Sequence, residues 1–293
     1  MRSKNYLILF ALFAFSCSSD SSSNDGTNNN SGSIDNSGNV STENALLVSQ
    51  ISVQDGGLEV ENQYFTYDGN KITTMSSVGS FHTELLNFIY TDDKISRIDR
   101  YFDTSDGIYS RFYFFYDSEN RLSSFEHCYF DSSGQCGNLD TFSFEYSSNG
   151  TVTQNYSYDY GNGQYDTGSL LLQLDNNGNI TSGTDTFQES DENGNQINIT
   201  VNANIEHDNF NSPFKNIVGI DPFILFEIID SEFSYNLSFS YFNNVTLIDY
   251  SYSNNPENYS VTFAYDYNED DYPRQVIVNE NGSSEQNIDI AYY

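Results

Sequence analysis

Apolar and polar residues alternate along most of the chain after residue 45, and each alternating run ends in a short polar turn. The clearest unit runs from Phe112 to Phe125, with an alternating strand, a turn that begins at Asp117, and a second strand from Leu122. A period of two predicts a β-strand with one face in a core and the other in water. Because the unit recurs, the sequence predicts a series of β-hairpins.

The residues of the turns explain how each hairpin closes. Asp117 and Asp175 stand at the first turn position, where a side-chain oxygen accepts a backbone N–H. Asn120 and Gly178 follow three residues later, where a positive φ is tolerated. This predicts a type I turn followed by a bulge. We interpret the tyrosine before the aspartate, such as Tyr116, as a strand-end residue that packs over the turn.

We therefore predict a single all-β domain over residues 45–293, in which antiparallel β-hairpin repeats form a curved sheet or a partly closed barrel of roughly 14 to 17 strands. The alternation fails in residues 217–230, which contain the apolar run Phe223-Ile-Leu-Phe226. That segment predicts one short helix or a crossover that seals one end of the sheet.

The N-terminus predicts an export signal in residues 1–16. Basic residues precede the apolar run from Tyr6 to Phe15, which is as long as a signal peptide and too short to span a bilayer. The run ends in Ala14-Phe-Ser-Cys17, which resembles a bacterial lipobox and predicts lipidation of Cys17. Acyl chains on this residue would anchor the protein to a membrane. The alternative is an ordinary signal peptide with an incidental cysteine.

Residues 17–44 are rich in Ser, Asn and Gly, which predicts a flexible tether without a core. Its start, Cys17-Ser-Ser-Asp20, resembles the sorting signals of Bacteroidetes lipoproteins that are displayed on the cell surface. We expect the protein at the outer membrane, on the cell surface, with a periplasm-facing lipoprotein as the alternative.

The chain is strongly acidic, with 42 Asp and Glu against 10 Lys and Arg and a formal net charge of -32. This charge repels phosphate backbones and anionic headgroups, so we expect no nucleic-acid partner. Cations and basic patches on other proteins are the partners that it favours. Alternatively, the charge only keeps a β-rich surface soluble and discourages edge pairing.

Two resemblances follow from the repeats and their order. The pattern Phe-x-Tyr-Asp-x-x-Gly-x-Leu resembles YD (RHS-type) repeats. Three further motifs, at 207–215, 243–246 and 265–273, resemble a group of uncharacterised Bacteroidetes surface lipoproteins over residues 45–293. That group has no assigned activity, so the resemblance implies only a fold and an address.

Cys128 and Cys136 flank a turn and lie near the ends of one hairpin. In an exported protein such a pair predicts a disulfide, although free thiols and a redox or metal site are alternatives.

No sequence motif points to an enzyme. His82, His127 and His207 lack the spacing of a zinc site, and neither a nucleophile elbow nor a phosphate-binding glycine loop occurs. His207 occupies the strand-end position of the usual tyrosine. With so many acids, pairs of carboxylates are uninformative about a glycosidase. We expect a non-enzymatic protein without a cofactor.

Calcium is the metal that the sequence favours, through oxygen ligands on alternate residues. The glycines of these loops stand at the fourth position instead of the sixth, which fits hairpin turns better. The weak candidate ligands are Asp175, Asn177, Asp191, Asn193, Asp270 and Asp271.

Tyr156, Tyr158 and Tyr160, or Tyr250 and Tyr252, could present a flat aromatic face to a glycan. The alternative is cross-strand aromatic packing. The leading hypothesis is a lipid-anchored binding or adhesion module with an unknown protein or glycan ligand. The other two hypotheses are capture or processing of an extracellular polysaccharide and a structural role in the cell envelope.

Overall fold

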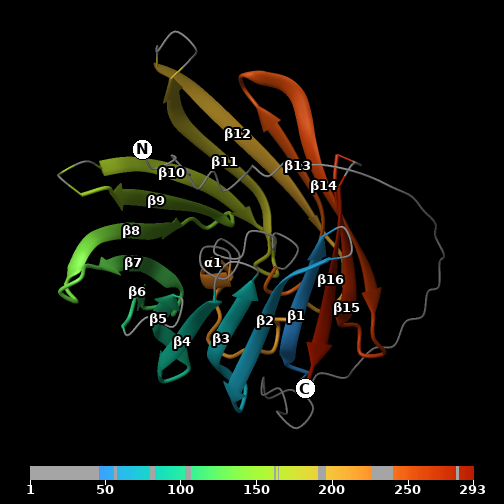
Figure 1. The fold of residues 1–293 in the computed structure, drawn as a ribbon. Helices are drawn as coiled ribbons and strands as arrows, with labels where there is room; N and C mark the ends of the chain where they lie inside the picture. The colour runs from blue at the N-terminus through green and yellow to red at the C-terminus, as the bar shows by residue number, and fades with distance from the viewer. Residues whose placement is uncertain are drawn as a thin grey trace.

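The computed structural model describes residues 46–55, 58–79, 83–102, 107–161, 163, 165–190, 196–225, 240–281 and 284–293. Sixteen antiparallel strands form a closed barrel in which each strand pairs with the preceding one (Figure 1). The last strand returns to the first, with Ile51 opposite Ile290, so the sheet has no free edge. The predicted all-β fold is confirmed, and the barrel is closed.

The strands have these bounds in chain order: β1 (Val48–Asp55), β2 (Leu58–Asp68), β3 (Lys71–Gly79), β4 (Thr83–Thr91), β5 (Lys94–Phe102), β6 (Ser110–Tyr116), β7 (Leu122–Phe130), β8 (Cys136–Tyr146), β9 (Thr151–Asp159), β10 (Tyr165–Leu174), β11 (Ile180–Ser190), β12 (Gln196–His207), β13 (Val245–Tyr252), β14 (Asn255–Tyr267), β15 (Pro273–Glu280) and β16 (Ser284–Tyr292). One short helix, α1 (Pro222–Ile224), lies between β12 and β13. Within the described ranges, no helix has the length and apolar character needed to cross a membrane.

The two faces of each strand differ in polarity. In β12, Ile199, Val201 and Ala203 face the barrel interior and are buried. Asn202 and Asn204, which alternate with these residues along the strand, are exposed on the outer face. The same alternation recurs around the barrel, where inward positions join one apolar core and most outward positions are Ser, Thr, Asn or charged. The wall therefore has a mainly apolar inner face and a mainly polar outer face, which also exposes single large apolar side chains such as Val78, Phe115 and Leu171.

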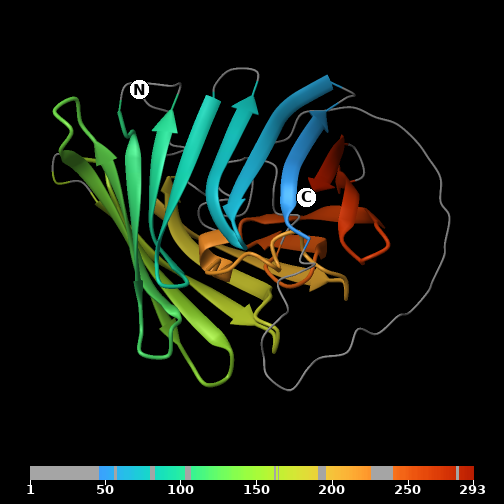
Figure 2. The same cartoon turned by 90° about the horizontal axis from the view of Figure 1, so that it is seen from below.

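The β12–β13 connection is described over residues 208–225 and 240–244. Residues 208–225 enter the barrel and are called the plug. Its Phe214 packs edge-on against Phe65 with ring centroids 6.0 Å apart, and Phe223 stacks on Phe144 at 4.6 Å. Figures 1 and 2 place α1 inside the ring of strands. The apolar side chains of the plug thus complete the core from within.

The plug closes one end of the barrel. This plugged end carries the connections that follow even-numbered strands, together with the start of β1 and the end of β16. The backbone N–H of Val218 donates to the carbonyl of Asn70 in the β2–β3 turn at 2.9 Å, and the Tyr90 hydroxyl donates to the Val218 carbonyl at 3.0 Å. The short helix predicted within residues 217–230 is found as α1, whereas 226–230 lie outside the described residues. The connections after odd-numbered strands form the opposite, far end.

The hairpin turns have the predicted chemistry. In the β6–β7 turn, Asp117 Oδ1 accepts hydrogen bonds from the backbone N–H groups of Glu119 and Arg121, both at 2.9 Å. Asn120 has φ +67° and Gly178 has φ +90° in the corresponding turns. The positive φ completes the turn without a clash for these residue types.

Strand-end tyrosines tie β2, β6, β8, β14 and β16 to the start of the strand before each of them. Five strand-end tyrosines share this arrangement, in which the hydroxyl donates to a carbonyl about 20 residues earlier, as expected for the two arms of one hairpin. The pairs are Tyr67 to Val48 (2.9 Å), Tyr116 to Ile95 (2.7 Å), Tyr146 to Leu122 (2.8 Å), Tyr265 to Val245 (2.7 Å) and Tyr292 to Pro273 (2.7 Å). Their predicted structural role is confirmed.

Candidate functional site

Most of the tyrosines expected to stack on a ligand lie on the inner wall. Tyr156 and Tyr158 of β9 and Tyr252 of β13 are partly buried against the core, and Tyr250 is only 2% exposed. The prediction of a flat face turned to solvent is therefore wrong for Tyr250, because it shares the inward face of its strand with buried Ile248. Tyr160, after β9, is 54% exposed.

Tyr156 is held across a glycine on the neighbouring strand. Its register partner on β10 is Gly168, and a Cβ added to that glycine would overlap the Tyr156 hydroxyl. The absence of a side chain at residue 168 therefore lets the ring lie flat along the inner wall. Tyr158 packs next to it at 5.3 Å and meets Phe142 edge-on at 5.5 Å. These rings form an aromatic group on β8 and β9, in which Phe142 is buried and the two tyrosines are partly buried.

Asp185 of β11 is an acid within an apolar part of the same wall. Its neighbours in register are Leu170 and Val201, both buried, and Asp185 itself is 8% exposed. Its Oδ1 has no hydrogen-bond partner in the part of the chain that the structure describes. Burial raises the pKa of Asp185, a backbone hydrogen bond from Thr186 opposes this, and the charge of Asp166 raises the pKa further.

Sequence reasoning missed Asp185, although the chain carries a signal for it. The segment Gly183-Thr-Asp185-Thr-Phe187 alternates like its neighbours, which places the aspartate on the inward face with Gly183 and Phe187. A charged residue at an inward position of an apolar wall is unusual, because burial of a charge requires compensation. Burial raises the pKa of Tyr156, and the charge of nearby Asp185 raises it further. We take these two residues as the candidate site.

The inner wall of β2 to β8 also carries polar residues, and its acids are paired, although Gln63 Oε1 has no hydrogen-bond partner within the described ranges. Glu61 Oε1 accepts hydrogen bonds from the Gln63 amide at 2.9 Å and from the Ser77 hydroxyl at 2.7 Å. The Arg100 guanidinium forms a buried ion pair with Glu84. Buried polar groups that are paired in this way stabilise a fold more readily than they bind a ligand.

His127 belongs to the same polar group. Its ring stacks on Phe112 with centroids 3.8 Å apart, and its Nε2 lies 2.9 Å from the Ser110 hydroxyl. Burial and the charge of Arg100 lower the pKa of His127 to about 3. The imidazole is therefore neutral at physiological pH and serves as a packed core residue.

The described candidate calcium ligands belong to hairpin turns. Asp175 Oδ1 accepts hydrogen bonds from the backbone N–H groups of Asn177 at 2.8 Å and Asn179 at 2.9 Å, and closes the β10–β11 turn. Asp270 and Asp271 belong to the β14–β15 turn, where Asn268 Oδ1 accepts from the Asp270 N–H at 3.0 Å. Across the described ranges, no group of three or more His, Cys, Asp or Glu could hold a metal ion. Asp191 and Asn193 lie outside these ranges.

The two cysteines of the β7–β8 hairpin form a disulfide. Cys128 and Cys136 have sulfur atoms 2.12 Å apart and Cα atoms 5.6 Å apart. Cys17, the expected lipidation site, lies outside the described residues, as do the signal segment 1–16 and the tether 17–44.

The three motifs that carried the lipoprotein resemblance meet at the root of the plug. The carboxylate of Asp208 accepts hydrogen bonds from the Asn244 N–H and side-chain amide, both at 3.1 Å, and from the Tyr267 hydroxyl. Phe210 stacks on Tyr267 at 4.3 Å, and the Asn211 N–H donates to the Asp271 carbonyl at 3.0 Å. These motifs therefore fasten the plug to β13 and β14.

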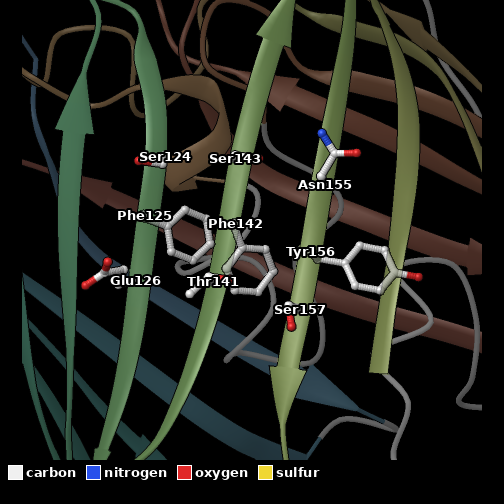
Figure 3. Close-up of a pocket in the computed structure, with 9 residues that line it drawn as sticks. All are labelled: Ser124, Phe125, Glu126, Thr141, Phe142, Ser143, Asn155, Tyr156 and Ser157. Atoms are coloured by element: carbon white, nitrogen blue, oxygen red, sulfur yellow. The ribbon is translucent and has the colours of Figure 1, made fainter. Parts of the chain in front are cut away.

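A shallow hollow of about 250 Å³ lies on the wall of β7, β8 and β9. Its lining is a block of three neighbouring residues from each strand, shown in Figure 3. Phe125 and Phe142 stack at 4.2 Å, and Tyr156 reaches toward the next strand (Figure 3). These three rings belong to the inner face that is described above. The other residues that line the hollow are the acid Glu126 and small polar residues of the same strands.

Comparison with solved structures places the fold among known barrels. A porin-like protein from Bacteroides vulgatus matches with a TM-score of 0.56 and 14% identity, over 85% of this chain and 99% of that chain. A porin-like protein from Bacteroides uniformis matches with a TM-score of 0.41 and 8% identity, over 84% of this chain and 98% of that chain. No family model matches the sequence, and no curated protein matches it. The chain thus shares its fold with the B. vulgatus protein.

Proposed function

We propose that this protein is a non-enzymatic binding module, held at the outer membrane by lipid on Cys17, whose barrel is a cup surrounded by water. The observation that carries this proposal is the polarity of the wall, which is polar outside and apolar inside. Barrels that cross an outer membrane have the reverse pattern, with an apolar band outside and a polar interior. A barrel of the present polarity is stable in water and needs a separate anchor.

The presence of the plug favours a cup that is closed at one end and argues against an open channel. Residues 208–225 fill one end of the barrel with buried side chains such as Phe214 and Ile217. Ligand binding is therefore expected at the far end, from which the inner wall of β9 to β13 is approached. There Tyr158, Phe187 and Tyr252 are only partly buried.

The outer-membrane address rests on two independent indications. The first is the lipobox-like start with Cys17. The second is the fold shared with a Bacteroides protein described as porin-like. Since β1 begins at the plugged end, a flexible tether from Cys17 would join the barrel at that end and leave the far end accessible.

Membrane fractionation with an alkaline carbonate wash tests the anchor. We expect the full chain to stay with the membranes, Cys17→Ala to be released in soluble folded form, and Ser18→Ala to behave like the wild type. Retention of Cys17→Ala after the wash would show that the barrel itself is inserted, which contradicts the cup.

Thermal unfolding of the full mature protein with soluble polysaccharides, peptides and amines tests binding. A ligand of the native state raises Tm by mass action. We expect such a shift to be reduced by substitution of Tyr158 on the inner wall and unchanged by Tyr64→Ala on the outer face of β2. A shift lost only with Tyr64→Ala would place binding outside the cup.

A further inference from the structure

We propose that Asp185 and Tyr156 form a site on the inner wall for a small ligand with a primary ammonium group on an alkyl chain. This inference rests on the proposed cup and specifies its ligand. It begins with the distribution of charge, because the sequence has no Lys or Arg between Arg121 and Lys215, nor between Lys215 and Arg274. Strands β8 to β14 therefore carry acids but no Lys or Arg.

The other buried, inward-facing acids differ from Asp185. Glu84 is paired with Arg100, and Glu61 accepts two side-chain hydrogen bonds. Asp140, on β8, accepts the backbone N–H of Asp159 at 2.8 Å. Asp185 has a buried carboxylate oxygen without a partner, between two aliphatic residues. Buried charges in proteins are normally paired, so a partner from outside the chain fits this position.

The surroundings of Asp185 select the chemistry of that partner. Asp166 and Asp185 both interact with Tyr156, so an anion would be repelled. The Tyr156 ring lies over Gly168 on the adjacent strand, and an aromatic face attracts a cation. Leu170 and Val201 flank the carboxylate and suit an alkyl stem. A carboxylate, an aromatic ring and aliphatic walls together match an alkylammonium ion better than a neutral sugar.

The site is approached from the far end of the barrel. Along β10 and β11, Asp166 and Phe187 lie nearer that end than Asp185 does, and both are only partly buried. A ligand that enters there would pass the tyrosines of β9 before it reaches the carboxylate.

Isothermal titration of the full mature protein with 1,5-diaminopentane, at pH 7.5 and constant ionic strength, tests the proposal. The neutral isostere 1,5-pentanediol is the control ligand. We expect the diamine to bind and the diol not to bind. Asp185→Asn and Tyr156→Leu should each lower the affinity for the diamine by about ten-fold or more, which corresponds to the loss of one strong contact. Asp249→Asn removes an exposed, outward acid from β13 and should leave the affinity unchanged.

The outcomes separate this inference from the proposed function. Equal diamine affinity in wild type and Asp185→Asn, or no diamine binding at all, overturns the ammonium site. If a polysaccharide then raises Tm and Tyr158→Ala removes the shift, the cup stands with a different ligand. Circular dichroism of each variant confirms that a loss of binding is not a loss of folding, and Asp185→Asn is nearly isosteric with the native residue.

Discussion

Removal of the hydroxyl groups from the strand-end tyrosines tests what the repeated Tyr-Asp motif does. The variant replaces Tyr67, Tyr116, Tyr146 and Tyr265 with phenylalanine. Each hydroxyl donates one hydrogen bond of 2.7 to 2.9 Å to a backbone carbonyl at the plugged end. Phenylalanine retains the ring and its packing, so the variant isolates the contribution of the hydrogen bonds.

The expected magnitude follows from the number and separation of these bonds. A single intramolecular hydrogen bond contributes about 1 kcal/mol to the free energy of unfolding. The four tyrosines belong to different hairpins and share no hydrogen-bond partner, so their effects should add to about 4 kcal/mol. For a domain of this length, such a loss lowers Tm by about 10 °C.

Equilibrium urea unfolding at pH 7 measures the effect, with the midpoint expected to fall while the m-value stays constant. Tyr64→Phe is the matched control, because Tyr64 is 42% exposed on the outer face of β2. If the four-fold variant loses less than about 1 kcal/mol, or if Tyr64→Phe costs as much as one of the four, then the hydroxyls do not hold the strand ends together.

Three further predictions concern the plug and the hairpins. Burial raises the pKa of Asp221 to about 6, so the stability it contributes is complete below the unfolded pKa of about 3.9 and is lost as the pH rises through 6. Asp221→Asn should therefore flatten the loss of stability between these pH values in urea unfolding, and an unchanged profile would contradict the assignment. Replacement of both Cys128 and Cys136 by serine should cost about 2.5 kcal/mol by loop entropy, measured by urea unfolding against wild type in oxidised and reduced form; equal stability of the two forms would refute it. Asp208→Ala should cost about 3 kcal/mol because it removes the carboxylate that accepts hydrogen bonds from both the backbone N–H and the side-chain amide of buried Asn244, and leaves the Asn211 carbonyl as the acceptor of the amide. A loss no larger than that of Tyr64→Phe would show that the plug is held elsewhere.

Local chemistry allowed the sequence to determine the hairpins. The alternation around Phe112 and Phe114 fixes a strand because a period of two places every second side chain on one face. The turn at Asp117 was predictable because its side chain bonds backbone atoms two and four residues away. Such interactions depend only on residues that are neighbours in the chain. The role of Tyr116 at the strand end was predictable for the same reason.

The candidate site depended on relations that the sequence does not display. Alternation shows that Asp185 and Tyr156 each share a face with apolar residues, but not that Gly168 leaves room for the tyrosine ring between them. In the same way, Asp208 and Tyr267 are 59 residues apart in the chain, and their hydrogen bond required the plug to return beside β14.

The sequence by itself determined an all-β chain, the local form of its turns, and the partition of most residues between a buried and a solvated face. Only the tertiary structure decided that the sheet closes, which face becomes the interior, and what fills it. Closure depends on pairing between β1 and β16, at opposite ends of the chain, after the twist and register of every intervening strand have accumulated. The apolar face turned inward because the plug and the opposite walls could bury it there, while the polar face was left to water.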